Sequence, residues 1–293
     1  MSTKKIGNVY FINKNFNEAY EKYMECLEFI DAFKSNKFKQ NVYNCIGNIK
    51  FYSVQYEEAM VYYEEALNYC FLNNNFSIRN NIEYNLALTY FNLNDYNKSL
   101  KKIEEVLKRS MAKGLHLKFK LLQGSVYMEL GLFKQALNLY EEISKYSLLN
   151  NETKGIVYNN IALCYMYNMQ YDDARKYFNL ASDVTKLIPY MSHKIIWDKA
   201  RLEQTLGQYE EAKKLFSQGM MLSEKVNDYK YKLRYLGNLY LLEETNTREL
   251  REILHKILNV SKQLNLQNKI IWARKKLIDI AIKENDLSIL KEA

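Results

Sequence analysis

The chain has 293 residues, of which only one is proline and nine are glycine. Because these two residues form most tight turns, an all-β or α/β fold with many short connections is excluded. Hydrophobic residues make up 48% and charged residues 26%, which excludes a disordered or collagen-like chain. Composition therefore predicts a long, almost purely helical protein.

The net charge is +8, and basic residues are concentrated in one stretch. From Lys98 to Lys120 there are eight basic residues and two acidic ones, Glu104 and Glu105. This stretch is either a binding patch for nucleic acid or an acidic partner, or a solvated helix face. We favour the solvated face, because lysine is the usual residue on such faces.

No motif indicates export, membrane insertion, metal binding or catalysis. The N-terminus lacks the apolar segment of a secretory signal, and the longest charge-free window, 155–171, contains four amide side chains. No cysteine belongs to a CxxC motif, and no histidine has the spacing of a metal ligand. We therefore expect a cytoplasmic, non-enzymatic protein without a metal or another cofactor, whose four cysteines are reduced and buried: Cys26, Cys45, Cys70 and Cys164.

A short pattern recurs along the chain at a nearly constant interval. An aromatic residue is followed three positions later by a small one, and successive small residues lie 40, 40, 37, 38 and 38 positions apart. A seventh, degenerate copy places Leu250 a further 38 positions on. The six small residues are Ala19, Ala59, Ser99, Ala136, Ala174 and Ala212.

Each copy has the same internal spacing. Twelve positions before the recurring small residue lies another small residue, such as Gly7 or Gly47, and in the seventh copy Gly237 lies thirteen positions before Leu250. Four positions after it lies a bulky side chain, such as Tyr23 or Tyr63. Offsets of three, four and seven place these residues on one stripe of an α-helix. The pattern predicts two antiparallel helices per copy, which bury their stripes by stacking on neighbouring copies.

This spacing resembles the tetratricopeptide repeat (TPR) family over at least six of seven copies. Two features depart from that family: the period is 37–40 rather than 34, and the proline expected near each repeat end is missing, the only proline being Pro189. The resemblance implies an all-α, right-handed α-α superhelix (solenoid) of about seven hairpins. We expect a single domain over 1–293 with repeats at 1–34, 40–74, 80–112, 117–149, 155–187, 193–226 and 230–263, and a C-terminal capping helix at 266–293.

In TPR proteins the first helix of each hairpin lines the inner wall of the superhelix. At the corresponding positions this chain carries asparagines in its first half and arginines, lysine and aromatics in its second. An asparagine amide can pair with both the C=O and the N–H of a peptide, and arginine can clamp a carboxylate. An extended peptide of a few residues fits this lining. The alternative is that these positions carry asparagine only because the whole chain is rich in it. The predicted peptide-binding residues are Asn44, Asn48, Asn81, Tyr84, Asn85, Asn159, Trp197, Arg201, Arg234 and Asn238.

The asparagine-bearing inner wall, the lengthened repeats and the repeat number resemble the peptide-pheromone receptors of Gram-positive bacteria. That family, known as RRNPP, joins Rap-type response-regulator antagonists to DNA-binding PlcR- and NprR-type regulators. The resemblance implies quorum sensing: a short secreted peptide binds in the TPR groove and its binding is relayed to a protein or transcriptional output. Residues 4–34 already match the first repeat, so we expect no DNA-binding domain within this sequence upstream of it. Either such a domain has been excised or the protein is naturally shortened. The output is therefore unassigned, with a response regulator, a DNA-binding protein and a homodimer as open alternatives and no membrane partner.

Three other functions compete with this interpretation. A chaperone-binding TPR needs a carboxylate clamp, but Cys45, Asn81 and Asn85 stand where the second and third repeats should carry asparagine, lysine and arginine. A scaffold would dock a folded partner through its convex or basic surface. Nucleic-acid binding would use the same basic stretch and depend steeply on salt. The residues that would matter for the scaffold are Lys101, Lys102, Lys108 and Arg109.

Overall fold

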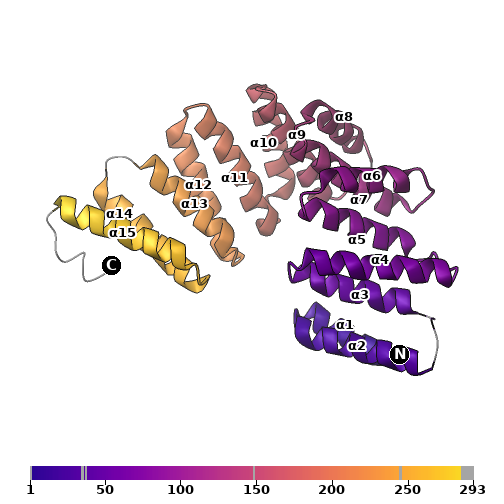
Figure 1. Cartoon of the computed structure of the whole chain (residues 1–293). Helices are drawn as coiled ribbons and strands as arrows, with labels where there is room; N and C mark the ends of the chain where they lie inside the picture. The colour runs from indigo at the N-terminus through magenta and orange to yellow at the C-terminus, as the bar shows by residue number, and fades with distance from the viewer. Residues whose placement is uncertain (1, 34–35, 37, 148, 244–245, 285–293) are drawn as a thin grey trace. The chain divides into compact units, whose positions relative to one another are not determined.

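A computed structural model describes residues 2–33, 36, 38–147, 149–243 and 246–284. The regular structure of these residues is entirely α-helical, which confirms the predicted fold class (Figure 1). The helices are α1 (Ser2–Ile12), α2 (Phe16–Ala32), α3 (Lys39–Tyr52), α4 (Tyr56–Leu72), α5 (Arg79–Asn92), α6 (Tyr96–Leu107), α7 (Lys113–Glu129), α8 (Phe133–Ser144), α9 (Asn151–Tyr167), α10 (Tyr171–Thr185), α11 (Pro189–Thr205), α12 (Tyr209–Lys225), α13 (Tyr229–Leu242), α14 (Thr247–Gln263) and α15 (Gln267–Glu284).

Consecutive helices pack as antiparallel hairpins (Figure 1). The packed pairs include α1 with α2, α3 with α4, α5 with α6, α9 with α10, α11 with α12, and α13 with α14. The last helix, α15, packs on α14 and buries Ile270, Ala273, Leu277 and Ala281. It thus covers the apolar face of the last hairpin, as a capping helix should. Residues 285–293 of the predicted cap lie outside the described residues.

The same turn joins the two helices of six hairpins. Each turn contains one residue in the left-handed conformation, at a spacing that reproduces the sequence period: Lys14, Val54, Asn94, Gly131, Met169 and Gly207. The following backbone N–H donates to a carbonyl five residues back, for example from Gln55 to Lys50 over 2.9 Å. This 6→1 bond is the Schellman motif, which satisfies a carbonyl at the end of the first helix.

The small residues of the repeat lie at the contacts between paired helices. All six alanines and serines of the recurring pattern are 0% exposed. A methyl group added at Gly47 would lie 2.6 Å from the ring of Tyr63, so this glycine is required for the ring to pack there. Gly7 is covered in the same way by Tyr23. The core is therefore a series of local clusters, each shared by neighbouring helices.

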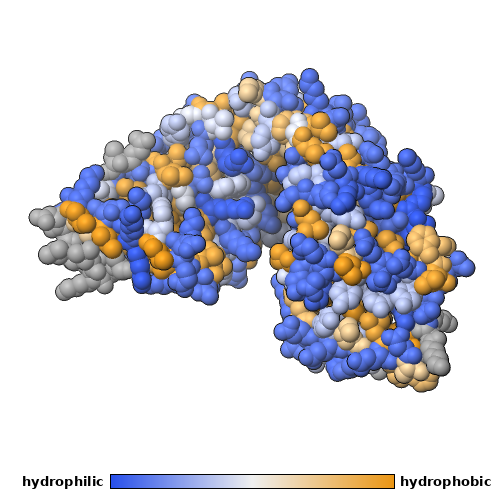
Figure 2. Space-filling view, in the orientation of Figure 1, coloured by the Kyte–Doolittle hydropathy of each residue, from blue (hydrophilic) through white to orange (hydrophobic). Residues whose placement is uncertain are grey.

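The chain divides into two compact units, Met1–Leu139 and Tyr140–Ala293. A single superhelical domain over 1–293 stays a prediction. Hydrophilic side chains cover most of the face visible in Figure 2, with smaller apolar groups between them. None of the helices in the described part of the chain is both long and apolar enough to cross a bilayer.

Candidate functional site

In the first unit, four of the predicted residues lie around one pocket of about 350 Å³. Asn48 comes from α3, and Asn81, Tyr84 and Asn85 come from α5. Ile82 and Leu86 of α5 are buried, whereas Tyr84 and Asn85 of the same helix are partly buried and Asn81 is exposed. The pocket is lined by Phe11, Asn48, Phe51, Tyr52, Tyr63, Asn81, Tyr84, Asn85, Leu88, Leu115 and Lys118.

Three asparagines of this unit bond one another across neighbouring repeats. The Nδ2 of Asn85 donates to the Oδ1 of Asn48 over 3.0 Å and to the Oδ1 of Asn44 over 3.1 Å. The Oδ1 of Asn48 also accepts from the hydroxyl of Tyr63 over 2.8 Å. These bonds fix the orientation of the amides, so the three asparagines join two repeats, and Asn48 and Asn85 also line the pocket.

Each of these amides keeps part of its hydrogen-bonding capacity. Within the described residues, no protein group bonds the Nδ2 of Asn44 or Asn48, the Oδ1 of Asn85, or either end of the exposed Asn81 amide. Donors and an acceptor are thus available at the pocket. A ligand's peptide groups need both kinds of partner.

Aromatic rings form the apolar part of the same pocket. Tyr84 packs edge-on against the buried Phe119, with ring centroids 5.3 Å apart, and burial raises the pKa of the Tyr84 hydroxyl. Tyr52 is 62% exposed and lies 5.5 Å from Phe11. Lys118 has its Nζ 6.0 Å from the Tyr84 ring and is the one cation among the residues that line the pocket.

In the second unit, the predicted residue Asn159 bonds Asp198, which was not among the predicted site residues. Asn159 on α9 donates from Nδ2 to the Oδ2 of Asp198 on α11 over 2.9 Å. The Oδ1 of Asn159 is buried and has no hydrogen-bond partner in the part of the chain described. A sequence signal existed, because Asp198 lies two positions before the small residue Ala200, as Asn85 lies two before Ala87.

The Asp198 carboxyl lies in a mixed electrostatic environment. Burial raises its pKa above the ordinary value, while the hydrogen bond from Asn159 and the charges of Arg201 and Arg234 oppose that rise. Arg234 is exposed and lies with its guanidinium 4.9 Å from the centroid of Tyr231. Asn159 thus bonds this carboxyl directly, and Arg201 and Arg234 act on it through their charge.

The remaining two predicted residues of this unit have other roles. Trp197 packs against Phe216 and Tyr235, with centroids 5.5 and 5.3 Å away, so it is mainly a packing residue. Asn238 donates from Nδ2 to the backbone carbonyl of Arg234, over 3.1 Å within its own helix. Both still line a second pocket of about 660 Å³ in this unit, together with Arg234.

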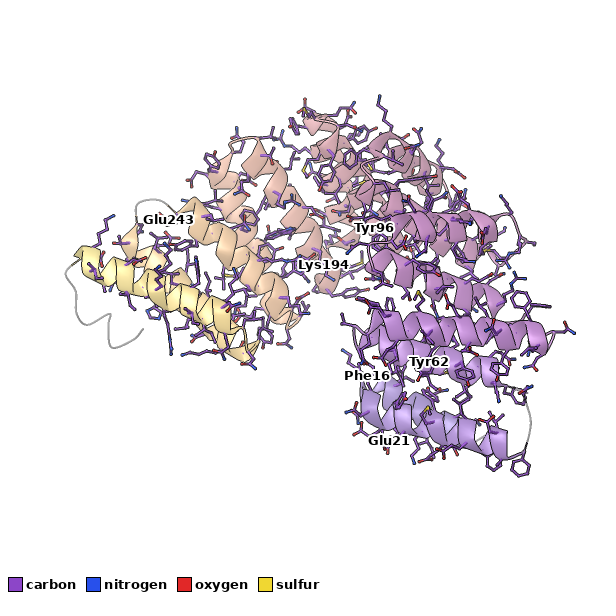
Figure 3. The ribbon with its side chains drawn as sticks, viewed as in Figure 1. Phe16, Glu21, Tyr62, Tyr96, Lys194 and Glu243 are labelled. Atoms are coloured by element: carbon purple, nitrogen blue, oxygen red, sulfur yellow. The ribbon has the colours of Figure 1, made fainter. Side chains whose placement is uncertain are left out.

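Lys194, which is labelled in Figure 3, is a further inner-face cation on α11. It is exposed, and its Nζ lies 5.7 Å from the Tyr231 ring. The preceding residue, His193, is fully buried, and burial lowers the pKa of its imidazole. Its Nε2 lies 3.6 Å from the nearest Asp228 oxygen. Within the described residues, no group of three or more His, Cys, Asp or Glu side chains could hold a metal ion.

Acidic neighbours reduce the charge of the basic stretch. Lys98 pairs with Asp95 over 2.7 Å and Lys102 with Glu105 over 3.0 Å. Arg109 pairs with the buried Glu83, which Arg79 also contacts. These ion pairs favour a solvated face with local pairing over a binding patch.

Comparison with known proteins identifies the repeat type and the fold. Residues 84–110 match the tetratricopeptide repeat family model. No curated protein matches the chain. Among solved structures, the apo form of the quorum sensor NprR from B. thuringiensis superposes with a TM-score of 0.73 at 18% identity, covering 99% of this chain and 83% of that one.

Two further solved structures are similar. The apo form of RapI has a TM-score of 0.66 at 15% identity, covering 94% of this chain and 78% of that one. The Rap conjugation gene regulator of plasmid pLS20, in complex with the Phr* peptide, has a TM-score of 0.61 at 17% identity. That match covers 99% of this chain and 92% of the regulator. The predicted resemblance to TPR-type receptors is thus confirmed for the fold.

Proposed function

We propose that the chain is a non-enzymatic receptor that binds a short linear peptide on the inner helices of its hairpins. The observation that carries this proposal is the linked set of Asn44, Asn48 and Asn85, whose bonds to one another leave donors and an acceptor free beside an aromatic pocket. Such a surface holds peptide backbone whatever its sequence, while the aromatic rings and Lys118 select side chains.

The fold comparisons support the same function. The Rap regulator, whose fold resembles this chain, was solved with a peptide, and NprR is a quorum sensor. By this analogy the ligand is a signalling peptide, and its binding is relayed to a response regulator or a DNA-binding protein. Cytoplasmic location and assembly as a homodimer are part of the same proposal.

Affinity selection tests the proposal directly. The full chain is incubated with a pool of synthetic heptapeptides of randomised sequence, and retained peptides are identified by mass spectrometry. Retained peptides are then titrated by calorimetry into the wild type and into Asn81→Ala. Because Asn81 has no hydrogen-bond partner among the described residues, its loss should weaken binding about tenfold without unfolding the protein.

Asn68→Ala is the matched control, since Asn68 is an exposed asparagine on α4 and lines no pocket described above. Its affinity should equal that of the wild type. Retention of no peptide, or equal affinities in all three proteins, would overturn the proposal. The scaffold function would gain support if reversing Lys101, Lys102 and Lys108 abolished partner binding instead.

A further inference from the structure

The second pocket lies under the cap, between α11, α13, α14 and α15 in the second unit. Its volume is about 660 Å³, and much of its wall is apolar. Leu241 on that wall is 69% exposed and Leu266 is 39% exposed. Both apolar side chains are therefore available to be covered by an apolar group of a ligand. Trp272 of α15 packs edge-on against Tyr240, with centroids 5.2 Å apart, and forms another side.

A glycine opens this pocket. Gly237 lies inside α13, and a methyl group added there would meet no atom within 4 Å. By contrast, the corresponding glycines of the first two repeats, Gly7 and Gly47, are covered by tyrosine rings. The covering tyrosine stands sixteen positions after each of those glycines, and sixteen positions after Gly237 stands Ile253. No ring therefore lies over Gly237.

The charges at the pocket are all positive. Lys230, Arg234 and Lys269 line it, and none of its described lining residues is acidic. Within the described residues, neither Lys230 nor Lys269 has an ion-pair partner, although the Lys269 ammonium lies 5.6 Å from the Trp272 ring. Asn238 adds an amide to the same wall. An apolar cavity with unpaired cations is complementary to an apolar group that carries a negative charge.

We propose that this pocket of the second unit binds the C-terminal residue of a peptide ligand, with the bulky apolar side chain in the cavity and the free carboxylate between Lys230, Arg234 and Lys269. This inference rests on the proposed function and assigns one end of the ligand. Asn238 pairs with the last peptide group.

Tryptophan emission reports on this site alone, because the chain has two tryptophans, Trp197 and Trp272, and both line the pocket. The probe is N-acetyl-L-leucine, titrated into the full chain, with N-acetyl-L-leucinamide and octanoate as comparisons. We expect a saturable change with the free acid. The amide, which lacks the charge, should bind at least tenfold more weakly, and octanoate, which lacks the peptide group, should also bind more weakly.

Three variants test whether N-acetyl-L-leucine binds in this pocket. Gly237→Leu places its Cβ in open space and should fill the cavity, so we expect it to abolish the change in emission. Lys269→Glu should weaken binding of N-acetyl-L-leucine at least tenfold. Lys275→Glu makes the same charge change at an exposed position of α15 outside the pocket and should leave the affinity within twofold of the wild type.

The outcomes separate this inference from the proposed function. Equal affinity for the acid and the amide, no saturable change with either, or full binding by Gly237→Leu would overturn the inference. Heptapeptides that bind through Asn81 would still support the receptor function in that case. Tighter binding of octanoate would assign the pocket to a fatty acid and overturn the peptide assignment. Binding of N-acetyl-L-leucine without retention of any heptapeptide would leave the pocket in place and remove the receptor function.

Discussion

At the residue scale, one repeat position links neighbouring hairpins in both units. Asn85 and Asp198 each lie two positions before the small residue of their repeat, and each bonds the residue three positions before the small residue of the preceding repeat. The amides of Asn85 and Asn159 are therefore not free side chains. They hold adjacent first helices together and present their remaining donors and acceptors to a ligand.

Substitutions of two asparagines separate these roles. Asn85→Ala removes the bonds to Asn44 and Asn48, so we expect the free energy of unfolding to fall by about 1–2 kcal/mol. Asn81→Ala removes no bond to a described residue and should change it by less than about 0.5 kcal/mol. Urea denaturation, monitored by circular dichroism, measures the free energy of unfolding of both variants. Equal losses in the two variants would contradict the linking role of Asn85.

The buried carboxyl of Asp198 predicts a pH dependence of stability. Its pKa in the folded protein is raised above the ordinary 3.8, mainly by burial. The folded state therefore holds this proton more tightly than the unfolded state, and stability is lost as pH rises through the raised pKa. Asp198→Asn has no proton to lose and keeps an acceptor for Asn159. Its stability relative to the wild type should increase from pH 4 to pH 7.5.

Denaturant unfolding at those two pH values, with Asp183→Asn as the control at an exposed position of the same unit, measures the effect. A relative stability of Asp198→Asn that decreases with pH would mean that Arg201 and Arg234 outweigh burial.

At the element scale, the turns between paired helices are unequal in strain. Two turns have glycine at the left-handed position, Gly131 and Gly207. In the second hairpin the same position is the β-branched Val54, at φ 63°. A left-handed conformation costs a non-glycine residue about 1–2 kcal/mol. Val54 is 68% exposed, so replacing it removes little packing.

Val54→Gly should therefore stabilise the protein by about 0.5–1 kcal/mol, after allowance for the greater flexibility of glycine in the unfolded chain. The reciprocal change, Gly207→Ala, should destabilise it by about 1 kcal/mol. Thermal unfolding of both variants checks the pair. A lower midpoint for Val54→Gly would show that the turn is not strained.

Two helical glycines should respond in opposite directions. Gly47→Ala forces a methyl group against the Tyr63 ring and should cost about 1–3 kcal/mol. Gly237→Ala meets no atom and should gain about 0.5–1 kcal/mol from helix propensity. Chemical denaturation of the two variants decides this, and a loss of stability in Gly237→Ala would mean that the pocket is closed in solution.

The repeat spacing was sufficient to predict the helices, because buried small and aromatic residues such as Ala59 and Tyr63 must share a stripe. It did not predict the turns, since only two of the six left-handed positions carry the glycine that signals them. It also missed Asp198, whose role depends on contact with Asn159 almost forty residues away. Gly237 is a helical glycine like Gly47, but no ring lies over it, and the sequence spacing did not show that difference.

At the scale of the whole molecule, each of the two compact units carries its own pocket. The first, Met1–Leu139, presents amides and aromatic rings, and the second, Tyr140–Ala293, presents cations around an apolar cavity. A repeat protein distributes its contacts among neighbours, so either surface can be altered without unfolding the rest. The variants above use that independence.

Photo-crosslinking tests the central claim, that a peptide binds on the first helices of the hairpins. A heptapeptide pool with benzoylphenylalanine at one position is irradiated with the full chain, and the adducts are mapped by mass spectrometry. We predict adducts on α3 and α5 of the first unit and on α11 and α13 of the second. Adducts confined to the second helices, such as α4, α6 and α12, would contradict the account.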